Sequence, residues 1–324
     1  MLRRNTDDRG VRCPHCWGVR LTTGTHSAAW NAFWRGSAAP AGKPGCLPAG
    51  GGLAEVLSSV WRQFAQSLPA RARVLDIGTG DGRVMGWMLA ERSDLQLEGI
   101  DLAPELPPPP ADTRSRGGVA MEQLPAAAGA FDAIVGQFAF EYGDLAAAAA
   151  EFARVLTGDG VIGLVTHHRD GPIYAQNVRR RQGIEWALFE AKLPSMARRA
   201  LDRCAPGQLY PPAPIRDAPQ RGAELFGARS AAWEIAEAIR LTLARGQAGP
   251  ANEVAAAIRE IEERAMGEIG RLNALEAACA QIADDTALSV ALNAAGLRQR
   301  ERHPLNDGRG TSAFADFRLI GRLD

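Results

Sequence analysis

Residues 74–82 read VLDIGTGDG, and this short stretch limits the possible folds more than any other part of the chain. An apolar run that ends in an acid and continues into glycines is typical of a buried strand followed by a tight loop. Glycine at every second position allows positive φ and leaves no Cβ between the backbone and a ligand. A helix that starts near Asp81 would add free N–H groups. We therefore expect a ligand cradle at the carboxyl end of the first strand of an α/β sheet.

Two common glycine loops fit this spacing poorly. A phosphate-binding P-loop ends in Gly-Lys followed by Ser or Thr, and no lysine follows the glycines here. The dinucleotide fingerprint places its third glycine where this chain has Arg83, whose side chain would hinder the packing of helix on strand. The spacing that is present, Gly78, Gly80 and Gly82 after Asp76, therefore indicates another ligand.

Strand and helix patterns alternate around the glycine loop. Helix patterns occupy residues 53–68, 83–93 and 145–156, and strand patterns occupy residues 73–78, 95–102, 131–138 and 160–168. The stretch 104–118 contains four consecutive prolines and is expected to be a link without regular structure. Such alternation predicts an α/β fold, with a parallel sheet that carries helices on both faces.

The pattern changes after His168, because no strand signal appears between about 172 and 283. Helical periodicity covers residues 174–193, and two long helices over 222–246 and about 250–279 are expected to form a helical hairpin. The three arginines at 179–181 fit a solvated helix face or a site for an anion. The end of the chain predicts a helix over 287–296 and strands over 297–303 and 314–323.

Composition argues against several classes of protein. Lys plus Arg and Asp plus Glu both number 37, so the net charge is zero and no overall field would attract nucleic acid or anionic lipid. No apolar run approaches the ~20 residues of a membrane helix. The first residues lack the apolar stretch of a signal peptide, and the abundance of alanine and arginine suggests a GC-rich bacterial genome. We expect a cytoplasmic protein without a membrane or nucleic-acid partner.

The five cysteines are irregularly spaced and do not indicate a disulfide framework. Cys13 and Cys16 form a C-x-x-C pair that Cys46 and His26 would have to complete for zinc. A second tight pair of ligands is missing from the sequence, so no metal site is expected.

Three features in combination resemble the class I S-adenosylmethionine-dependent methyltransferases. Asp76 with its three alternating glycines is similar to the family's first motif, and Asp101 ends the second strand about twenty residues later. Glu122-Gln-Leu-Pro, leading into Phe-Asp, is similar to the family's adenine loop, although Ala120 stands where many members have Asp. The resemblance covers roughly 53–168 and 284–323.

The resemblance implies S-adenosylmethionine as cofactor and a Rossmann-like sheet that is mostly parallel with an antiparallel last strand. It implies a cofactor site made of Asp76, Gly78, Thr79, Gly80, Gly82, Asp101, Leu102, Met121, Glu122 and Gln137. It divides the chain into an N-terminal tail and helical flap over 1–52, a cofactor-binding domain over 53–171 and 284–324, and a helical insertion over 172–283. The insertion is expected to serve as a lid, as a dimerisation arm, or as both.

The resemblance also places the acceptor at the carboxyl ends of the fourth and fifth strands. The catalytic candidates there are Glu141, Tyr142, His167 and His168. Adjacent residues of a strand face opposite sides, so at most one of the two histidines is expected to be a base. The predicted function is methyl transfer to O, N or C of a small molecule. Methylation of a protein or RNA, and a non-catalytic scaffold that binds the cofactor, remain the alternatives.

Overall fold

The computed structural model describes residues 52–203, 210–246, 250–308 and 312–323. Within these ranges the chain forms one seven-stranded sheet of order β3-β2-β1-β4-β5-β7-β6. Its strands are β1 (Arg73–Ile77), β2 (Gln96–Ile100), β3 (Arg114–Arg116), β4 (Phe131–Gln137), β5 (Leu156–His167), β6 (Leu297–Leu305) and β7 (Ala315–Arg322). The first five strands are mutually parallel, and β7 runs antiparallel to both β5 and β6. The predicted α/β sheet with an antiparallel last strand is confirmed.

The third strand lies inside the stretch that the sequence suggested would lack regular structure, so that prediction was wrong. β3 pairs with β2 in parallel register, with Gly99 opposite Ser115. Strand β3 is three residues long, and its two arginines are exposed at the edge of the sheet. A short edge strand with polar side chains carries no apolar alternation, so pairing with its neighbour defines it and local sequence does not.

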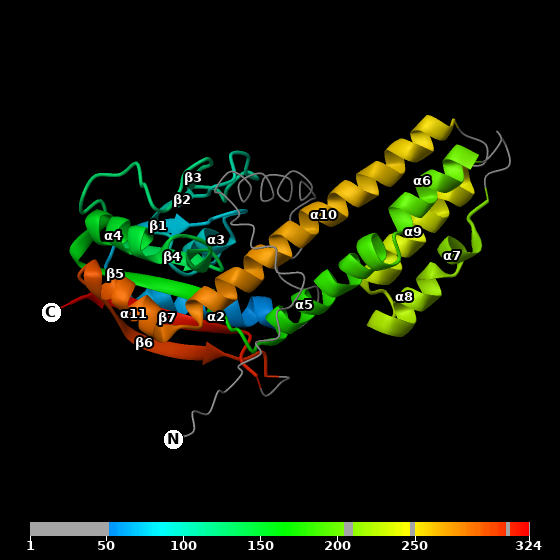
Figure 1. Ribbon diagram of the computed structural model, residues 1–324. Helices are drawn as coiled ribbons and strands as arrows, with labels where there is room; N and C mark the ends of the chain where they lie inside the picture. Colours follow the sequence, from blue (N-terminus) through cyan, green and yellow to red (C-terminus); the bar gives the residue numbers. More distant parts are fainter. Residues whose placement is uncertain (1–51, 204–209, 247–249, 309–311, 324) are drawn as a thin grey trace, which may run out of the picture.

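Helices cover both faces of the sheet (Figure 1). One face packs on α2 (Leu53–Ser67) and α3 (Arg83–Glu91) through a buried cluster that includes Trp61 and Phe64. The other face packs on α4 (Leu145–Val155) and α11 (Asp285–Ala294) through a cluster that includes Phe152 and Leu292. Both layers depend on the three- and four-residue spacing of apolar residues in these helices.

The segment 172–283 is called here the helical arm. Its described residues form helices joined by turns, without a strand. Its helices are α5 (Pro172–Glu185), a π-helical turn (Trp186–Glu190), α6 (Leu193–Arg203), α7 (Ala213–Arg216), α8 (Ala218–Phe226), α9 (Ala231–Arg245) and α10 (Ala251–Ile282). The predicted α9–α10 hairpin is present. The single helix expected over 222–246 is instead broken, because Gly227 has φ +99° and the Ser230 hydroxyl accepts from the Trp233 N–H to cap α9.

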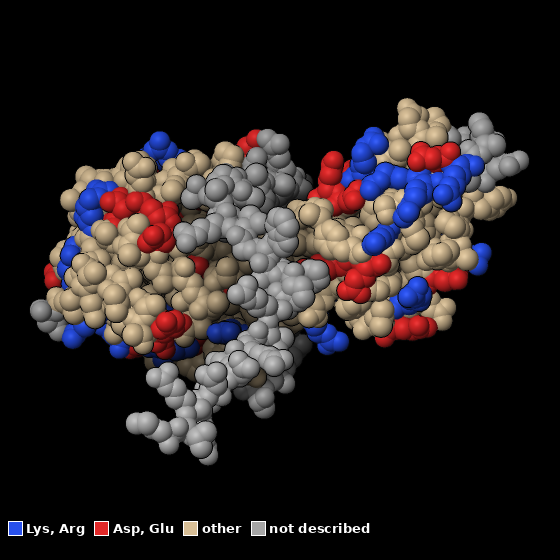
Figure 2. Space-filling model, viewed as in Figure 1, with Lys and Arg blue, Asp and Glu red and all other residues tan. Residues whose placement is uncertain are grey.

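Helices α5 and α10 run side by side out of the sheet layer and carry α6–α9 at their far end (Figure 1). Arg180 contacts Glu268 at 2.5 Å, and Arg181 contacts Glu276 at 2.5 Å. The run at 179–181 is therefore neither a plain solvated face nor an open anion site, since two of its arginines join the two helices. Acidic and basic side chains lie next to one another over much of the arm (Figure 2).

The tail and flap predicted over 1–52, with the possible zinc ligands Cys13, Cys16, Cys46 and His26, lie almost entirely outside the described residues. Among the residues described, no helix combines the length and apolar character that crossing a membrane requires.

Candidate functional site

The glycine loop between β1 and α3 has the backbone conformation that its sequence predicts. Gly78, Gly80 and Gly82 have φ angles of +62°, +53° and +72°. A Cβ on Gly78 would collide with the Cβ of Ala139, and a Cβ on Gly82 would lie 2.5 Å from Cδ of Pro110. The loop therefore needs glycine both for its φ angles and for space.

Asp76 lies beneath this loop and is 1% exposed. Its Oδ2 accepts a hydrogen bond of 2.7 Å from the Thr79 hydroxyl, whereas its Oδ1 has no partner among the described residues. Burial raises the pKa of the Asp76 carboxyl to about 7, the Thr79 bond opposes that rise, and the charges of Asp101 and Asp81 add to it. A buried oxygen without a partner is costly, so this position suits a ligand that brings a donor or a positive charge.

Asp101 follows β2 and ties the two strand ends together. Its Oδ2 accepts from the Gly80 N–H at 3.0 Å, and its Oδ1 accepts from the Ala103 N–H at 2.8 Å. Burial raises the pKa of this carboxyl, and its main-chain N–H partners act in the opposite direction. The Leu102 N–H also acts on this carboxylate, so three main-chain donors hold it and part of its lone-pair capacity is left for a ligand hydroxyl. Leu102, beside it, is half-buried.

The remaining predicted cofactor residues lie near the same strand ends, with part of their hydrogen-bonding capacity already used. Met121 and Glu122 are half-buried, and Glu122 Oε1 accepts from the Asp144 N–H at 2.9 Å. Gln137 ends β4, and its Oε1 accepts from Trp61 Nε1 at 2.9 Å. The other oxygen of Glu122 and the amide nitrogen of Gln137 are the atoms left to meet a ligand.

A second group of polar residues joins the ends of β4 and β5. Glu141 lies in a 3₁₀ turn (Phe140–Tyr142), and its side chain is fully buried. Its Oε1 lies 2.7 Å from Nδ1 of His167 and accepts from the main-chain N–H of the same residue at 2.9 Å. Its Oε2 has no partner in the described part of the chain. Two of the four catalytic candidates thus form a buried acid–imidazole pair.

Aromatic rings hold the imidazole of His167 in place. The Phe138 ring lies 4.3 Å from it, centroid to centroid, with an interplanar angle of 32°. The Tyr142 ring meets it edge-on at 6.0 Å. His168 has different surroundings, because it is half-buried and its Nδ1 accepts from the Asp170 N–H at 3.3 Å. The two histidines therefore lie in different environments, which agrees with the alternation of side chains along a strand.

Two further features of this site were not among the residues predicted for it. Phe138 has φ +54°, a conformation that is uncommon for an aromatic residue and that often marks a functional constraint. From the arm, Gln281 Nε2 donates to the carbonyl of Gly143 at 2.8 Å, so the end of α10 packs on the turn that carries Glu141. Phe138 follows β4 directly, and that position was the available signal, whereas nothing local marks Gln281.

The glycine loop and the Glu141–His167 pair are neighbours, because Gly78 contacts Ala139, the residue next to Phe138. Beyond His167 lies a cavity of about 440 Å³, called here the β5–β7 pocket. It is bordered by the 167–170 turn, by Ile282 and Ala283 at the end of α10, and by Arg302, Asp316 and Arg318 of β6 and β7. No cluster of three or more metal-ligating side chains occurs within the described residues.

Comparison with known proteins agrees with this geometry. Residues 52–206 match the family model described as a methyltransferase domain. No curated protein matches the chain.

Several solved structures are similar to parts of the chain. YcgJ from Bacillus subtilis is 24% identical, with a TM-score of 0.32, over 40% of this chain and 59% of its own. Geranyl diphosphate C-methyltransferase from Streptomyces coelicolor A3(2) is 19% identical, with a TM-score of 0.29, over 40% and 57%. A putative methyltransferase from Haloferax volcanii, solved with the Trm112 methyltransferase activator, is 14% identical, with a TM-score of 0.39, over 84% and 95%. The alignments span less than two thirds of the first two of these proteins.

The matched domain, the strand order with its antiparallel β7, and the acid–glycine cradle agree with one another. Residues 52–206 therefore form a methyltransferase domain, and S-adenosylmethionine is the cofactor of that family.

Proposed function

We propose that the protein transfers the methyl group of S-adenosylmethionine to a hydroxyl group of a small molecule, with His167 as general base and Glu141 as its positioning residue. The observation that carries this proposal is the buried Glu141–His167 pair at 2.7 Å, beside the cofactor loop. It favours an acceptor group that carries a proton, for which we propose a hydroxyl group, for the reason that follows.

When bound, the cofactor supplies a methyl group that its positively charged sulfur already activates. The protein must then hold the acceptor in line and keep water out. A general base is needed only where the acceptor atom carries a proton that it does not lose by itself near neutral pH. A hydroxyl group meets that condition, whereas a carboxylate does not. A buried base therefore favours an acceptor that must lose a proton, such as a hydroxyl group, over a carboxylate.

The hydrogen bonds of Glu141 indicate which ring nitrogen does the work. Its Oε1 accepts from the main-chain N–H of His167, so the same oxygen also acts as acceptor toward the ring. Nδ1 therefore keeps its proton, and Nε2 presents a lone pair that can receive the proton of the acceptor. Burial and the Phe138 ring restrict rotation of the imidazole and preserve this tautomer.

The residues around the glycine loop suit the cofactor. Among the described residues Asp76 has a buried oxygen without a partner, and Asp101 keeps part of its lone-pair capacity at the end of the next strand. Asp81 is a third carboxylate close enough to raise the pKa of Asp76, but Arg83 already pairs with it. The two remaining carboxylates, Asp76 and Asp101, beside bare backbone favour a ligand that combines a positive charge with hydroxyl groups, as S-adenosylmethionine does.

The test compares His167→Asn and Glu141→Gln with His303→Asn. His303 is a matched control, because its Nε2 lies 2.8 Å from Glu301 in an exposed pair on β6, outside the site. Calorimetry with S-adenosylhomocysteine measures cofactor binding, and transfer of a tritiated methyl group to fractionated extract measures turnover. We expect all three variants to bind cofactor and His167→Asn to lose about 10²–10⁴ in rate.

Each alternative has its own outcome in this test. Normal turnover by His167→Asn would refute the base. Label that enters only protein or RNA would refute a small acceptor, and label in no fraction would favour a scaffold. Absence of cofactor binding by the unmodified protein would contradict the cofactor site itself.

A further inference from the structure

Resting on the proposed function, we propose that the acceptor is a small hydroxylated carboxylic acid whose carboxylate binds Arg169 at the rim of the β5–β7 pocket. The proposal depends on what borders the pocket, on which of its charges are already paired, and on where His167 lies relative to Arg169.

The border of the pocket is unusually ionic for a small-molecule site. Seven of its nine residues have ionisable side chains, and only Ile282 and Ala283 are aliphatic. Ligand pockets of this size are mostly lined by apolar and aromatic side chains. An apolar ligand would remove water from these groups without replacing its hydrogen bonds, which is costly. The pocket therefore favours a hydrophilic ligand.

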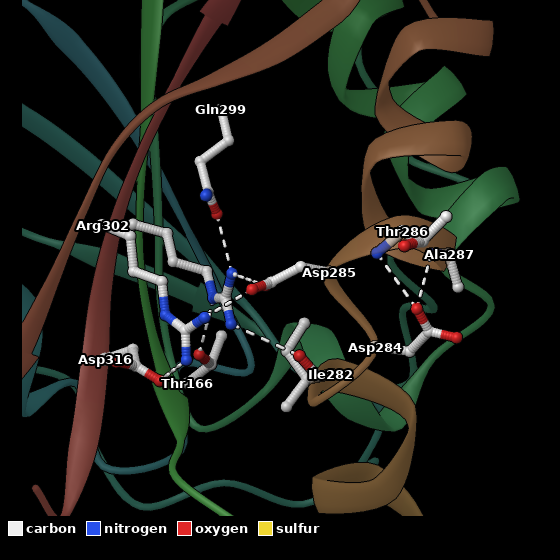
Figure 3. Close-up of polar contacts among 10 residues, drawn as sticks. Thr166, Ile282, Asp284, Asp285, Thr286, Ala287, Gln299, Arg302 and Asp316 are labelled. Atoms are coloured by element: carbon white, nitrogen blue, oxygen red, sulfur yellow. Dashed lines mark hydrogen bonds and ion pairs between the residues drawn. The ribbon is translucent and has the colours of Figure 1, made fainter.

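The floor of the pocket is a closed network of two arginines and two aspartates. Arg318 is 1% exposed, and its guanidinium donates to Thr166, Gln299, Asp285 and the carbonyl of Ile282. Arg302 binds Asp285 at 2.5 Å and Asp316 at 2.9 Å, and Figure 3 shows Arg302 directed toward these acids. The two positive charges are matched by two negative ones. The floor is therefore polar but has no cation left for a ligand.

The rim differs, because its arginine has no such partner. Arg169 lies in the exposed turn between β5 and α5, and within the described ranges it forms no ion pair. Its charge still reaches the interior of the site. Burial and the charges of Glu141 and Glu276 raise the pKa of the Cys279 thiol to about 12, and Arg169 acts in the opposite direction. Arg169 is thus the one described cation on this pocket that remains available for a ligand.

One available guanidinium matches a monoanion, and its planar fork fits a carboxylate. Asp170 is the opposing charge on the same exposed turn, and it disfavours a ligand with more negative charge, such as a phosphate dianion. Arg169 is two residues from His167 in sequence, and both border the pocket. A carboxylate on Arg169 would leave a hydroxyl group of the same small molecule facing Nε2 of His167.

The test uses the full-length protein saturated with S-adenosylhomocysteine and two probes of equal size, glycolate and its neutral amide. Ring signals of His167 and His168 are followed by NMR at constant ionic strength during titration with each probe. We expect a saturable shift with glycolate and none with glycolamide. Arg169→Gln should weaken glycolate binding about tenfold or more, the loss of one charge-assisted contact. Asp170→Asn is the matched control and should bind glycolate as well as, or better than, the unmodified protein.

Three results would overturn the proposal: equal shifts with both probes, glycolate affinity unchanged in Arg169→Gln, or tighter binding of inorganic phosphate than of glycolate. The proposed function is judged by different readouts, cofactor calorimetry and the rate loss in His167→Asn. An anion site at Arg169 and a base at His167 can therefore fail separately.

Discussion

Replacing Asp76 by asparagine should stabilise the cofactor-free protein, and the gain should grow as the pH rises from about 4 to about 7. The carboxyl group is 1% exposed, has one oxygen without a partner among the described residues, and has its pKa raised from 3.8 to about 7. Between these two values the folded chain holds a proton that the unfolded chain has released. The free energy of unfolding of the natural protein therefore falls as pH rises through this window and is level above it.

The shift in pKa sets the size of the effect. A difference of about three pH units, at 1.36 kcal/mol each, corresponds to about 4 kcal/mol lost by the natural protein across the window. Asparagine does not titrate, and its carbonyl oxygen can still accept from the Thr79 hydroxyl. The variant should therefore exceed the natural protein in stability at pH 8 by more than it does at pH 5.

Denaturation by guanidinium chloride at a series of pH values, followed by tryptophan fluorescence, measures this difference directly, since all other titrating groups are common to both proteins. In the presence of saturating S-adenosylmethionine the natural protein should be more stable than the variant. The positively charged ligand stabilises the carboxylate of Asp76 and should bind less tightly to a neutral asparagine. A stability difference that does not change between pH 4.5 and 7.5 would refute the reasoning, as would unchanged cofactor affinity in the variant.

Three other perturbations test separate parts of the structure. Asp101→Ala should weaken binding of S-adenosylhomocysteine by more than about 1 kcal/mol, measured by calorimetry. Asp132→Ala should not, because Asp132 is a half-buried acid at the start of β4, the opposite end of the strands. Arg318→Met should lower the free energy of unfolding by about 3–5 kcal/mol, because Asp285 and Thr166 lose their partner, and a midpoint equal to that of the natural protein would contradict this. Replacing residues 186–264 by a short linker should leave cofactor affinity within about twofold, because the neighbours of the glycine loop among the described residues lie outside this range. Loss of binding would show that the arm supports the cofactor site.

Most of the sheet could be predicted from the sequence, because each central strand is an apolar run bounded by turn residues. The glycine loop was predictable for a similar reason, since its φ angles depend on residue type at three local positions. The short strand β3 was not, because only its pairing with β2 defines it. The break between α8 and α9 was missed because a single glycine within a helical pattern is often tolerated.

In the candidate site too, some residues were predictable from local sequence and others depend on contacts that only the fold creates. Asp76 and Asp101 end neighbouring strands, so strand order alone brings them together. Glu141 and His167 were both candidates at strand ends, yet nothing in the sequence showed that one carboxylate oxygen binds both the ring and the main chain of the histidine. Arg318 lies on a strand that was expected, and its burial depends on Asp285 and Thr166, which only the folded chain brings near.

We propose that the two roles expected of the helical arm belong to different parts of it. The end of α10 reaches the site, through Gln281 on Gly143 and through Ile282 on Arg318. The bundle α6–α9 lies at the far end of α5 and α10, away from the sheet (Figure 1), so it does not cover the β5–β7 pocket. A lid role therefore concerns only the base of the arm. The far end carries the exposed apolar side chains of Phe189 and Leu225, 51% and 60% exposed, and we propose that a second copy of the chain packs against this end. The linker variant lacking 186–264 separates the two roles, because it keeps the residues at the base of the arm and removes the far end. If the far end forms the dimer, sedimentation of this variant should detect only monomers.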